Sequence, residues 1–158
     1  MRSAFSRLLR RFQPEGGGLE LRNLMAGPVV VNGALIEIIA PLPTGNRAVI
    51  QPDPAGGAFD VTVNGQEVTV PSAGIQAVYY AGSFGGHDTF VNSTNLMAID
   101  YGWGGGNNFL TEGTGPTYAF LFGDDNTFEV SAGDFGVAFT HGGQHNHIIG
   151  TPYFVYAG

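Results

Sequence analysis

Cysteine and lysine are both missing from this sequence of 158 residues. Without cysteine, disulfides, thiolate metal sites and thiol catalysis are excluded. Five of the six arginines lie at or before Arg22, so the chain from Asn23 onward has 11 acidic side chains and only Arg47. That part has no cationic surface for phosphate groups, which argues against nucleic-acid binding. No apolar run is long enough to cross a bilayer as a helix, so we expect no transmembrane segment.

Glycine, by contrast, is abundant, with 26 residues, and only 12% of the chain is charged. Hydrophobic residues make up 43%, which is enough for one packed domain. A high glycine content together with many Phe, Val and Thr residues is typical of strands joined by tight turns. The composition therefore favours an all-β fold.

The segment 1–26 differs from the rest of the chain. Four apolar residues are spaced as on one face of a short helix, with arginines around them: Phe5, Leu8, Leu9 and Phe12. We expect 1–26 to be a basic segment that either targets the protein or is flexible. The stretch LELRNLMAG (19–27) is similar to a short motif near the start of exported proteins of planctomycete bacteria, and this resemblance implies export.

A short pattern recurs at nearly constant spacing in the second half of the chain. Each copy opens with Gly, has Asp or Asn at its fourth position and ends in a large apolar residue. The copies are GGHDTF (85–90), GGGNNF (104–109), GDDNTF (123–128) and GQHNHI (143–148). A fixed period of about 20 residues indicates a solenoid, in which each unit buries its apolar face by stacking on the next. We therefore predict a right-handed parallel β-solenoid, either a β-roll or a β-helix, with two strands in each coil.

Stacking of the coils places equivalent residues above one another at about 4.8 Å. The predicted buried column consists of Phe90, Phe109, Phe128 and Ile148. A second aromatic column consists of Phe84, Trp103 and Phe122. A third column consists of Asp88, Asn107, Asn126 and Asn146, whose side chains could hydrogen-bond along the axis. The same stacking predicts that His87 lies over the positions of Gly106 and Asp125, near His145.

The segment FDVTVNGQEVTVP (59–71) interrupts the repeat. Two alternating strands flank Asn64-Gly65, a dipeptide that favours a tight hairpin turn. Because the end of a solenoid needs a cap over its exposed edge, we expect an antiparallel hairpin there. A faint continuation of the repeat at 45–50 and 65–70 competes with this interpretation, and we favour the hairpin. The predicted organisation is 27–74 for the N-terminal strands and hairpin cap, and 75–158 for the solenoid repeats.

Residues 75–148 resemble the hemolysin-type, or repeats-in-toxin, calcium-binding repeats, whose nonapeptide is G-G-x-G-x-D-x-U-x with U a large apolar residue. In Ser83–Val91 the residues Gly86, Asp88 and Phe90 match that pattern, whereas later copies carry Asn in place of Asp. The resemblance implies a β-roll, export from a Gram-negative cell and calcium ions between the coils. Calcium prefers six to eight oxygen ligands, so this thin set of charges predicts weak binding. The candidate ligands are Asp88, Asn107, Asp124, Asp125 and Asn126.

Two further groups could carry chemistry. His141, His145 and His147 are close together in the sequence, and they could ligate a transition metal or face solvent in the last repeat. A pair of carboxylates for glycoside cleavage would have to converge, whereas Asp124 and Asp125 are neighbours that point to opposite faces of a strand. The second group is therefore expected to be a solvated turn or a cation ligand.

Taken together, these patterns predict an exported or cell-surface structural or adhesive repeat module with weak or vestigial calcium binding, and not an enzyme. The alternative is a β-helix carbohydrate-active enzyme or a glycan-binding protein. The expected partners are calcium ions, surface glycans or other repeat modules.

Overall fold

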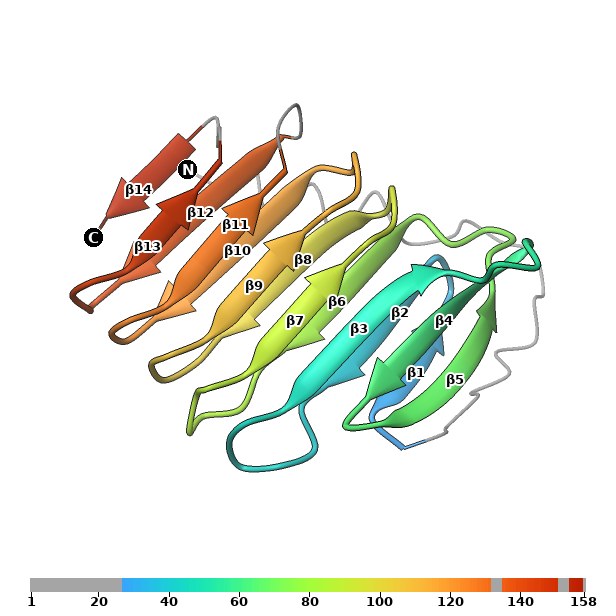
Figure 1. The fold of residues 1–158 in the computed structure, drawn as a ribbon, viewed down its shortest axis with the longest axis horizontal. Coiled ribbons are helices and arrows are strands. Elements are labelled where there is room, and N and C mark those ends of the chain that lie inside the picture. The colour runs from blue at the N-terminus through green and yellow to red at the C-terminus, as the bar shows by residue number, and fades with distance from the viewer. Residues whose placement is uncertain (1–26, 132–134, 151–153, 158) are drawn as a thin grey trace.

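The computed structural model describes residues 27–131, 135–150 and 154–157, and these residues form fourteen strands and no helix. The strands make two sheets of seven (Figure 1). Sheet A contains, in spatial order, β1 (Val29–Asn32), β2 (Leu35–Ile39), β6 (Ala77–Ala81), β8 (Met97–Gly102), β10 (Thr117–Phe122), β12 (Gly136–His141) and β14 (Phe154–Ala157). Sheet B contains β13 (His147–Ile149), β11 (Thr127–Val130), β9 (Asn108–Thr111), β7 (Thr89–Asn92), β3 (Arg47–Pro52), β4 (Ala58–Val63) and β5 (Gln66–Pro71).

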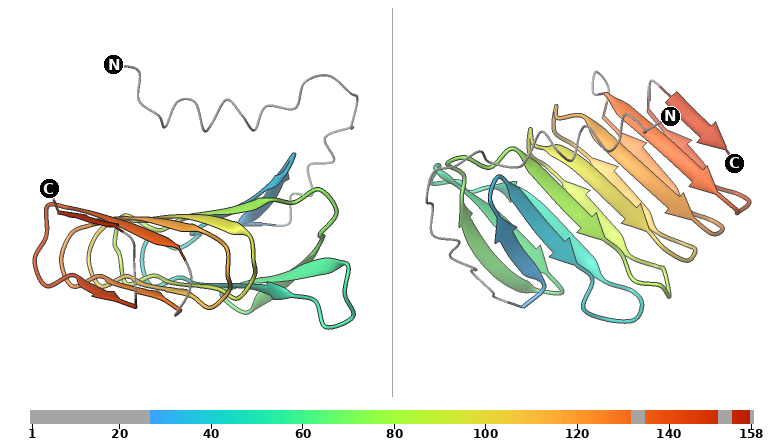
Figure 2. Two further views of the ribbon diagram at one scale, coloured as in Figure 1. Left: turned by 90° about the horizontal axis from the view of Figure 1, so that it is seen from above. Right: turned by 180° about the vertical axis from the view of Figure 1, so that it is seen from behind.

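From β6 onward the chain alternates between the two sheets, so that each coil contributes one strand to sheet A and the next to sheet B (Figure 2). From β2 to β14 the neighbours in sheet A are parallel, and so are the neighbours from β3 to β13 in sheet B. The predicted all-β solenoid is confirmed. Its parallel pairing begins at β2 and β3, before the predicted start of the repeats at residue 75. The predicted basic segment 1–26 lies outside the described residues.

The buried column of aromatic residues is present as predicted. Phe90, Phe109 and Phe128 are directly paired between neighbouring strands of sheet B, and Ile148 continues the column. All three Phe side chains are fully buried. Alternation explains this, because residues on either side of each Phe face outward along the strand. On the sheet A side of the same core, the ring of Tyr80 stacks on Phe90 at a centroid distance of 4.7 Å.

Antiparallel strands close the N-terminal end of the solenoid. The hairpin β4–β5 extends sheet B beyond β3, and β1 extends sheet A beyond β2. Asn64 and Gly65 both have positive φ, 50° and 81°, as a tight primed turn requires. Val61 and Val70 of the hairpin are buried in the same core as Val29 of β1. The predicted hairpin cap is confirmed, and the segment 65–70 belongs to it rather than to the repeat.

Candidate functional site

The third predicted column forms a continuous chain of hydrogen bonds, which we call the Asx ladder: Asn46, Asp88, Asn107, Asn126 and Asn146. The backbone N–H and Nδ2 of Asn107 donate to Oδ1 of Asn126 at 3.0 and 2.8 Å. Asn126 donates in the same way to Asn146, at 2.9 and 3.0 Å. At both of these steps, one side-chain oxygen therefore satisfies two donors of the previous coil.

Asn46 belongs to this ladder although the repeat pattern did not identify it. Its backbone N–H and Nδ2 both donate to Oδ1 of Asp88 at 2.8 Å, although the two residues are 42 positions apart. The hairpin β4–β5 is inserted between them and more than doubles the separation of 19 positions that joins Asp88 to Asn107. The faint backward alignment at 45–50 placed Gly45 at the opening of the unit, whereas the register aligns Gly45 with His87.

Asp88 differs from the asparagines because the nearest polar groups of its own loop are hydrogen-bond donors, whereas those around Asn107 are acceptors. The Nδ2 of Asn107 donates to the carbonyl oxygens of Trp103 and Gly104 in its own loop. At the same place in the preceding coil, the backbone N–H and the hydroxyl of Ser83 donate to Oδ2 of Asp88. An acceptor is needed there, and a carboxyl group supplies it where a carboxamide would present a donor.

The five predicted calcium ligands do not converge in this structure. Asp88, Asn107 and Asn126 are buried in the ladder, where protein N–H and O–H groups already occupy their oxygens. Asp124 and Asp125 are exposed in the turn between β10 and β11, and Oδ1 of Asp124 accepts the backbone N–H of Gln144 at 2.7 Å. Among the described residues, no three His, Cys, Asp or Glu side chains are grouped as a metal site requires. These five side chains therefore do not form the shared set of free oxygen ligands that a calcium ion prefers.

The residue before each ladder position adopts a left-handed conformation in five coils. These residues are Gly45, His87, Gly106, Asp125 and His145, with φ between 58° and 70°. The His87 ring lies over Gly106, where a Cβ atom would come within 2.5 Å of its Nδ1. His145 lies over Asp125, with 3.6 Å between Nδ1 and Oδ1, but both side chains are more than 70% exposed. His87 thus lies over Gly106 and His145 over Asp125, but two coils separate His87 from His145, which are therefore not neighbours as predicted. An exposed pair such as His145 and Asp125 contributes little stability.

The three C-terminal histidines do not share a face. His147 lies on the outer side of β13 in register with Thr127, whereas His145 lies in the turn. His141 ends β12, and its ring is 6.0 Å from that of Phe122. The left-handed turn explains the difference, because the strand alternation that would align His145 with His147 begins only after it.

Aromatic side chains gather on the outer side of sheet A, which the right panel of Figure 2 views directly. We call this surface the aromatic face. Its outward residues on β6, β8, β10 and β12, together with two from the adjoining loops, are Tyr79, Phe84, Ile99, Tyr101, Trp103, Tyr118, Phe120, Phe122 and Phe139. The predicted column of Phe84, Trp103 and Phe122 is part of it.

The rings of this face are stacked along the solenoid axis. Trp103 and Phe122 have centroids 4.4 Å apart and planes 11° apart, and Tyr101 and Phe120 have values of 4.6 Å and 11°. Rings so close and so nearly parallel must overlap face to face, so each covers the face of its neighbour and presents its edge outward. Burial raises the pKa of the Tyr101 hydroxyl. Burial, followed by the nearby Tyr101 and Glu37, raises the pKa of Tyr79.

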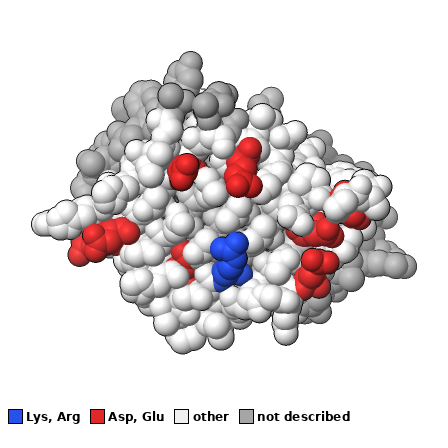
Figure 3. Space-filling view, in the orientation of Figure 1, with Lys and Arg blue, Asp and Glu red and all other residues white. Residues whose placement is uncertain are grey.

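Sheet B presents a different outer surface, which Figure 3 shows from the side of Figure 1. One outward column is polar throughout and consists of Arg47, Thr89, Asn108, Thr127 and His147. A second column is aliphatic except for one carboxylate and consists of Val49, Val91, Leu110, Glu129 and Ile149. The two outer surfaces of one solenoid therefore differ in chemistry, and only the face of sheet A is predominantly aromatic. Sequence reasoning missed the column of Tyr101, Phe120 and Phe139, although these residues lie two positions before Trp103, Phe122 and His141.

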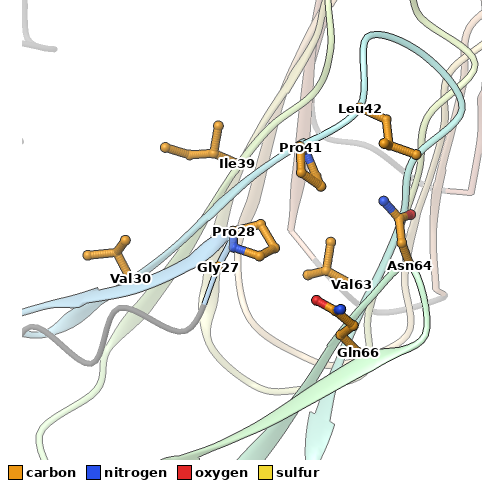
Figure 4. A pocket seen from close by; sticks show the side chains of 9 residues that line it. All are labelled: Gly27, Pro28, Val30, Ile39, Pro41, Leu42, Val63, Asn64 and Gln66. Carbon is orange, nitrogen blue, oxygen red and sulfur yellow. The ribbon is translucent and has the colours of Figure 1, made fainter.

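A hollow lies at the N-terminal end, between the loop after β2 and the hairpin turn (Figure 4). Its volume is about 670 Å³, and its lining is mostly apolar, with Ile39, Leu42 and Val63 among the contributing side chains. Ile39 and Leu42 are about half exposed. The lining includes Gly27, the first described residue, so this hollow lies where the chain enters the solenoid.

The core also holds a carboxyl group with one oxygen that lacks a hydrogen-bond partner among the described residues. Asp100 points inward from β8, is 1% exposed, and its Oδ1 has no partner among the described residues. Burial raises the pKa of Asp100 well above its usual value. The hydroxyl of the neighbouring Tyr80 is also without a partner among the described residues, and its pKa is raised by burial, then by Asp88 and Asp100.

These features define a parallel β-solenoid with an aromatic outer face and an internal Asx ladder. No family model matches the sequence, and comparisons with curated proteins and with solved structures gave no match. No helix among the described residues is long and apolar enough to cross a membrane.

Proposed function

We propose that this chain is a structural or adhesive repeat module of an exported or cell-surface protein, and that it acts by contact through the aromatic face of sheet A. The chemical difference between the two outer surfaces carries this proposal. A soluble monomer rarely leaves a contiguous apolar patch of more than a few hundred Å² uncovered, so such a face is typical of an interaction site. The motif at 19–27 supports export.

The rest of the fold supports a contact function because it holds the face rigid. The Asx ladder joins the turns that lead from sheet A to sheet B in successive coils, mostly through buried hydrogen bonds. Phe90, Phe109 and Phe128 pack beneath the sheet in a single column. A surface whose backbone is fixed in this way loses little conformational entropy when it binds a partner.

Glycan binding, the alternative suggested by the sequence, is less well supported on this face. The electron-rich face of an aromatic ring, rather than its edge, attracts the C–H groups of a sugar. Within the two columns, Tyr101 stacks on Phe120 and Trp103 stacks on Phe122, so these rings cover one another's faces. Their exposed edges are better suited to packing against an apolar protein surface.

Calcium binding stays a prediction of the repeat resemblance. The hydrogen bonding of Asp88 does not favour it, because both carboxyl oxygens already accept two donors each.

Retention on a phenyl-substituted resin tests the contact function. Tyr101→Arg places a charge in the aromatic face, and Leu110→Arg places the same charge on the outer side of sheet B in the same coil. Both residues are partly buried, which makes them matched substitutions. We expect the native chain and Leu110→Arg to be retained and Tyr101→Arg to elute earlier. Equal retention of all three proteins would contradict the proposal.

A further inference from the structure

The geometry points to a second copy of this chain as the partner: we infer that two chains pack through their aromatic faces into a twofold-symmetric dimer. This inference rests on the contact function proposed above and names its partner. In such a dimer two sheets lie face to face, as in a β-sandwich, with about 10 Å between them. A twofold interface uses the same patch on both chains, so the patch must be complementary to itself.

The size of the face suits a dimer. It extends over four neighbouring strands of sheet A, from β6 to β12, which is about 19 Å at 4.8 Å per strand. Along one strand it extends from Met97 to Trp103, which is about 20 Å at 3.3 Å per residue. The projected area is therefore about 400 Å² on each chain, or about 800 Å² in total before side-chain relief is counted. Stable interfaces usually bury more than about 1,000 Å², so a face of this size suits a weak dimer.

The distribution of charge also suits self-association. The centre of the face is formed by Ile99, Tyr101, Tyr118 and Phe122, none of which is an acidic or a basic residue. Ionisable groups lie at its margins, with Glu37 on β2 at the N-terminal end and the exposed His141 on β12 at the other. Aromatic residues in the centre and polar residues at the rim are the usual anatomy of a protein interface. Two such faces can therefore meet without burying a charge.

Two other occupants fit the face less well. An anionic membrane surface attracts Lys and Arg, but the only one after Arg22 is Arg47, which lies on the outer side of sheet B. The apolar residues of the N-terminal segment span positions 5–12, and a helix of that length covers about 12 by 10 Å. That is about a third of the face, whereas the aromatic face of a second copy has the same size and can cover all of it.

Sedimentation equilibrium of the full chain over a range of concentrations tests the inference. We expect a monomer–dimer equilibrium in which Leu110→Arg behaves as the native chain. Tyr101→Arg should raise the dissociation constant more than about 100-fold, because twofold symmetry buries two unpaired charges. Tyr118→Arg, on the neighbouring column, should have the same effect and provides a second variant if the first does not fold. Circular dichroism establishes that each variant is folded.

The single tryptophan provides an independent readout, because Trp103 lies in the face. Its emission should shift to the red when the native chain is diluted below the dissociation constant, and the emission of folded Tyr118→Arg should be red-shifted at every concentration.

A native chain that is monomeric at every concentration overturns the inference, while its retention on phenyl resin would leave the proposed contact function standing. A dimer that survives both arginine substitutions in the face also overturns it, since association would then use the strand edges.

Discussion

At the scale of single residues, the choice between Asp and Asn in the ladder follows the direction of the nearest donors. Asn107 faces three acceptors, the carbonyl oxygens of Trp103 and Gly104 and Oδ1 of Asn126, and its Nδ2 satisfies them. Asp88 faces two donors on Ser83 and accepts both. The Asp-to-Asn changes along the repeat are therefore structural requirements of each loop in this fold.

On this basis, Asn107→Asp should destabilise the protein at neutral pH. The substitution replaces a buried donor with an acceptor that faces three other acceptors, and we expect a loss of about 3 kcal/mol in the free energy of unfolding. Urea denaturation measures it. Asn108→Asp is the matched control, because the adjacent side chain is exposed, and it should change stability by less than about 0.5 kcal/mol. Equal effects of the two substitutions would refute the ladder as a source of stability.

Asp100 makes stability depend on pH. Because burial raises its pKa in the folded protein, the folded chain keeps a proton that the unfolded chain loses above about pH 4. The contribution of Asp100 to the free energy of unfolding should therefore be greatest below about pH 4 and fall by about 1.4 kcal/mol per pH unit until the folded pKa is reached. Asp100→Asn should flatten this decline, and Glu129→Gln, an exposed control, should retain it. Urea denaturation at several pH values measures this dependence. If the free energy of unfolding varied with pH in the same way in the native and Asp100→Asn chains, Asp100 would not be its source.

At the scale of the elements, the hairpin turn terminates the ladder. Nδ2 of Asn64 donates to Oδ1 of Asn46 at 3.1 Å, and the backbone N–H of Arg47 donates to Oδ1 of Asn64 at 2.8 Å. The turn thus takes the place that a further coil would occupy. The hairpin therefore caps the solenoid in two ways. Its turn hydrogen-bonds to the last ladder residue, and its valines cover the end of the apolar core.

The contribution of this cap can be isolated with Asn64→Gly. Glycine tolerates the positive φ of the turn, so the substitution removes only the side-chain hydrogen bonds. We expect thermal or urea denaturation to reveal a loss of about 1–2 kcal/mol. Asn64→Asp keeps the acceptor for Arg47 but places a carboxylate oxygen beside Oδ1 of Asn46, so it should be at least as destabilising as Asn64→Gly. An unchanged stability in Asn64→Gly would mean that the hairpin caps the solenoid through its valines alone.

The elements that the sequence predicted are those with a local or periodic signal. The buried column could be predicted because its members, Phe90, Phe109 and Phe128, recur at a fixed spacing, and the hairpin could be predicted because Asn64-Gly65 favours a tight turn. The place of Asn46 in the ladder could not be predicted, because the inserted hairpin breaks the fixed spacing between Asn46 and Asp88. The outward direction of Tyr101 was also hidden, because an aromatic residue at a strand position suits a core and a contact face equally well. Only the pairing of β8 with β10 places it on the outside.

At the scale of the whole molecule, the same hydrogen bonds that fix the ladder occupy the oxygens that calcium would need. Calcium requires six or more oxygen ligands, and the carboxyl groups predicted for it are divided between the buried Asp88 and the exposed Asp124 and Asp125. The coils are instead joined by the backbone pairing of two sheets and by one continuous apolar core.

We therefore expect the melting temperature of the full chain to be the same, within about 1 °C, in millimolar calcium, in magnesium and in a chelator. A ligand that binds only the folded state raises stability by about 2.7 kcal/mol at about 100 times its dissociation constant, which corresponds to several degrees for a domain of this size. Calorimetry would detect such a shift. A rise specific to calcium that is abolished by Asp88→Asn would restore the family resemblance as a functional one. A rise abolished by Asp124→Asn but not by Asp88→Asn would place the ion in the exposed turn.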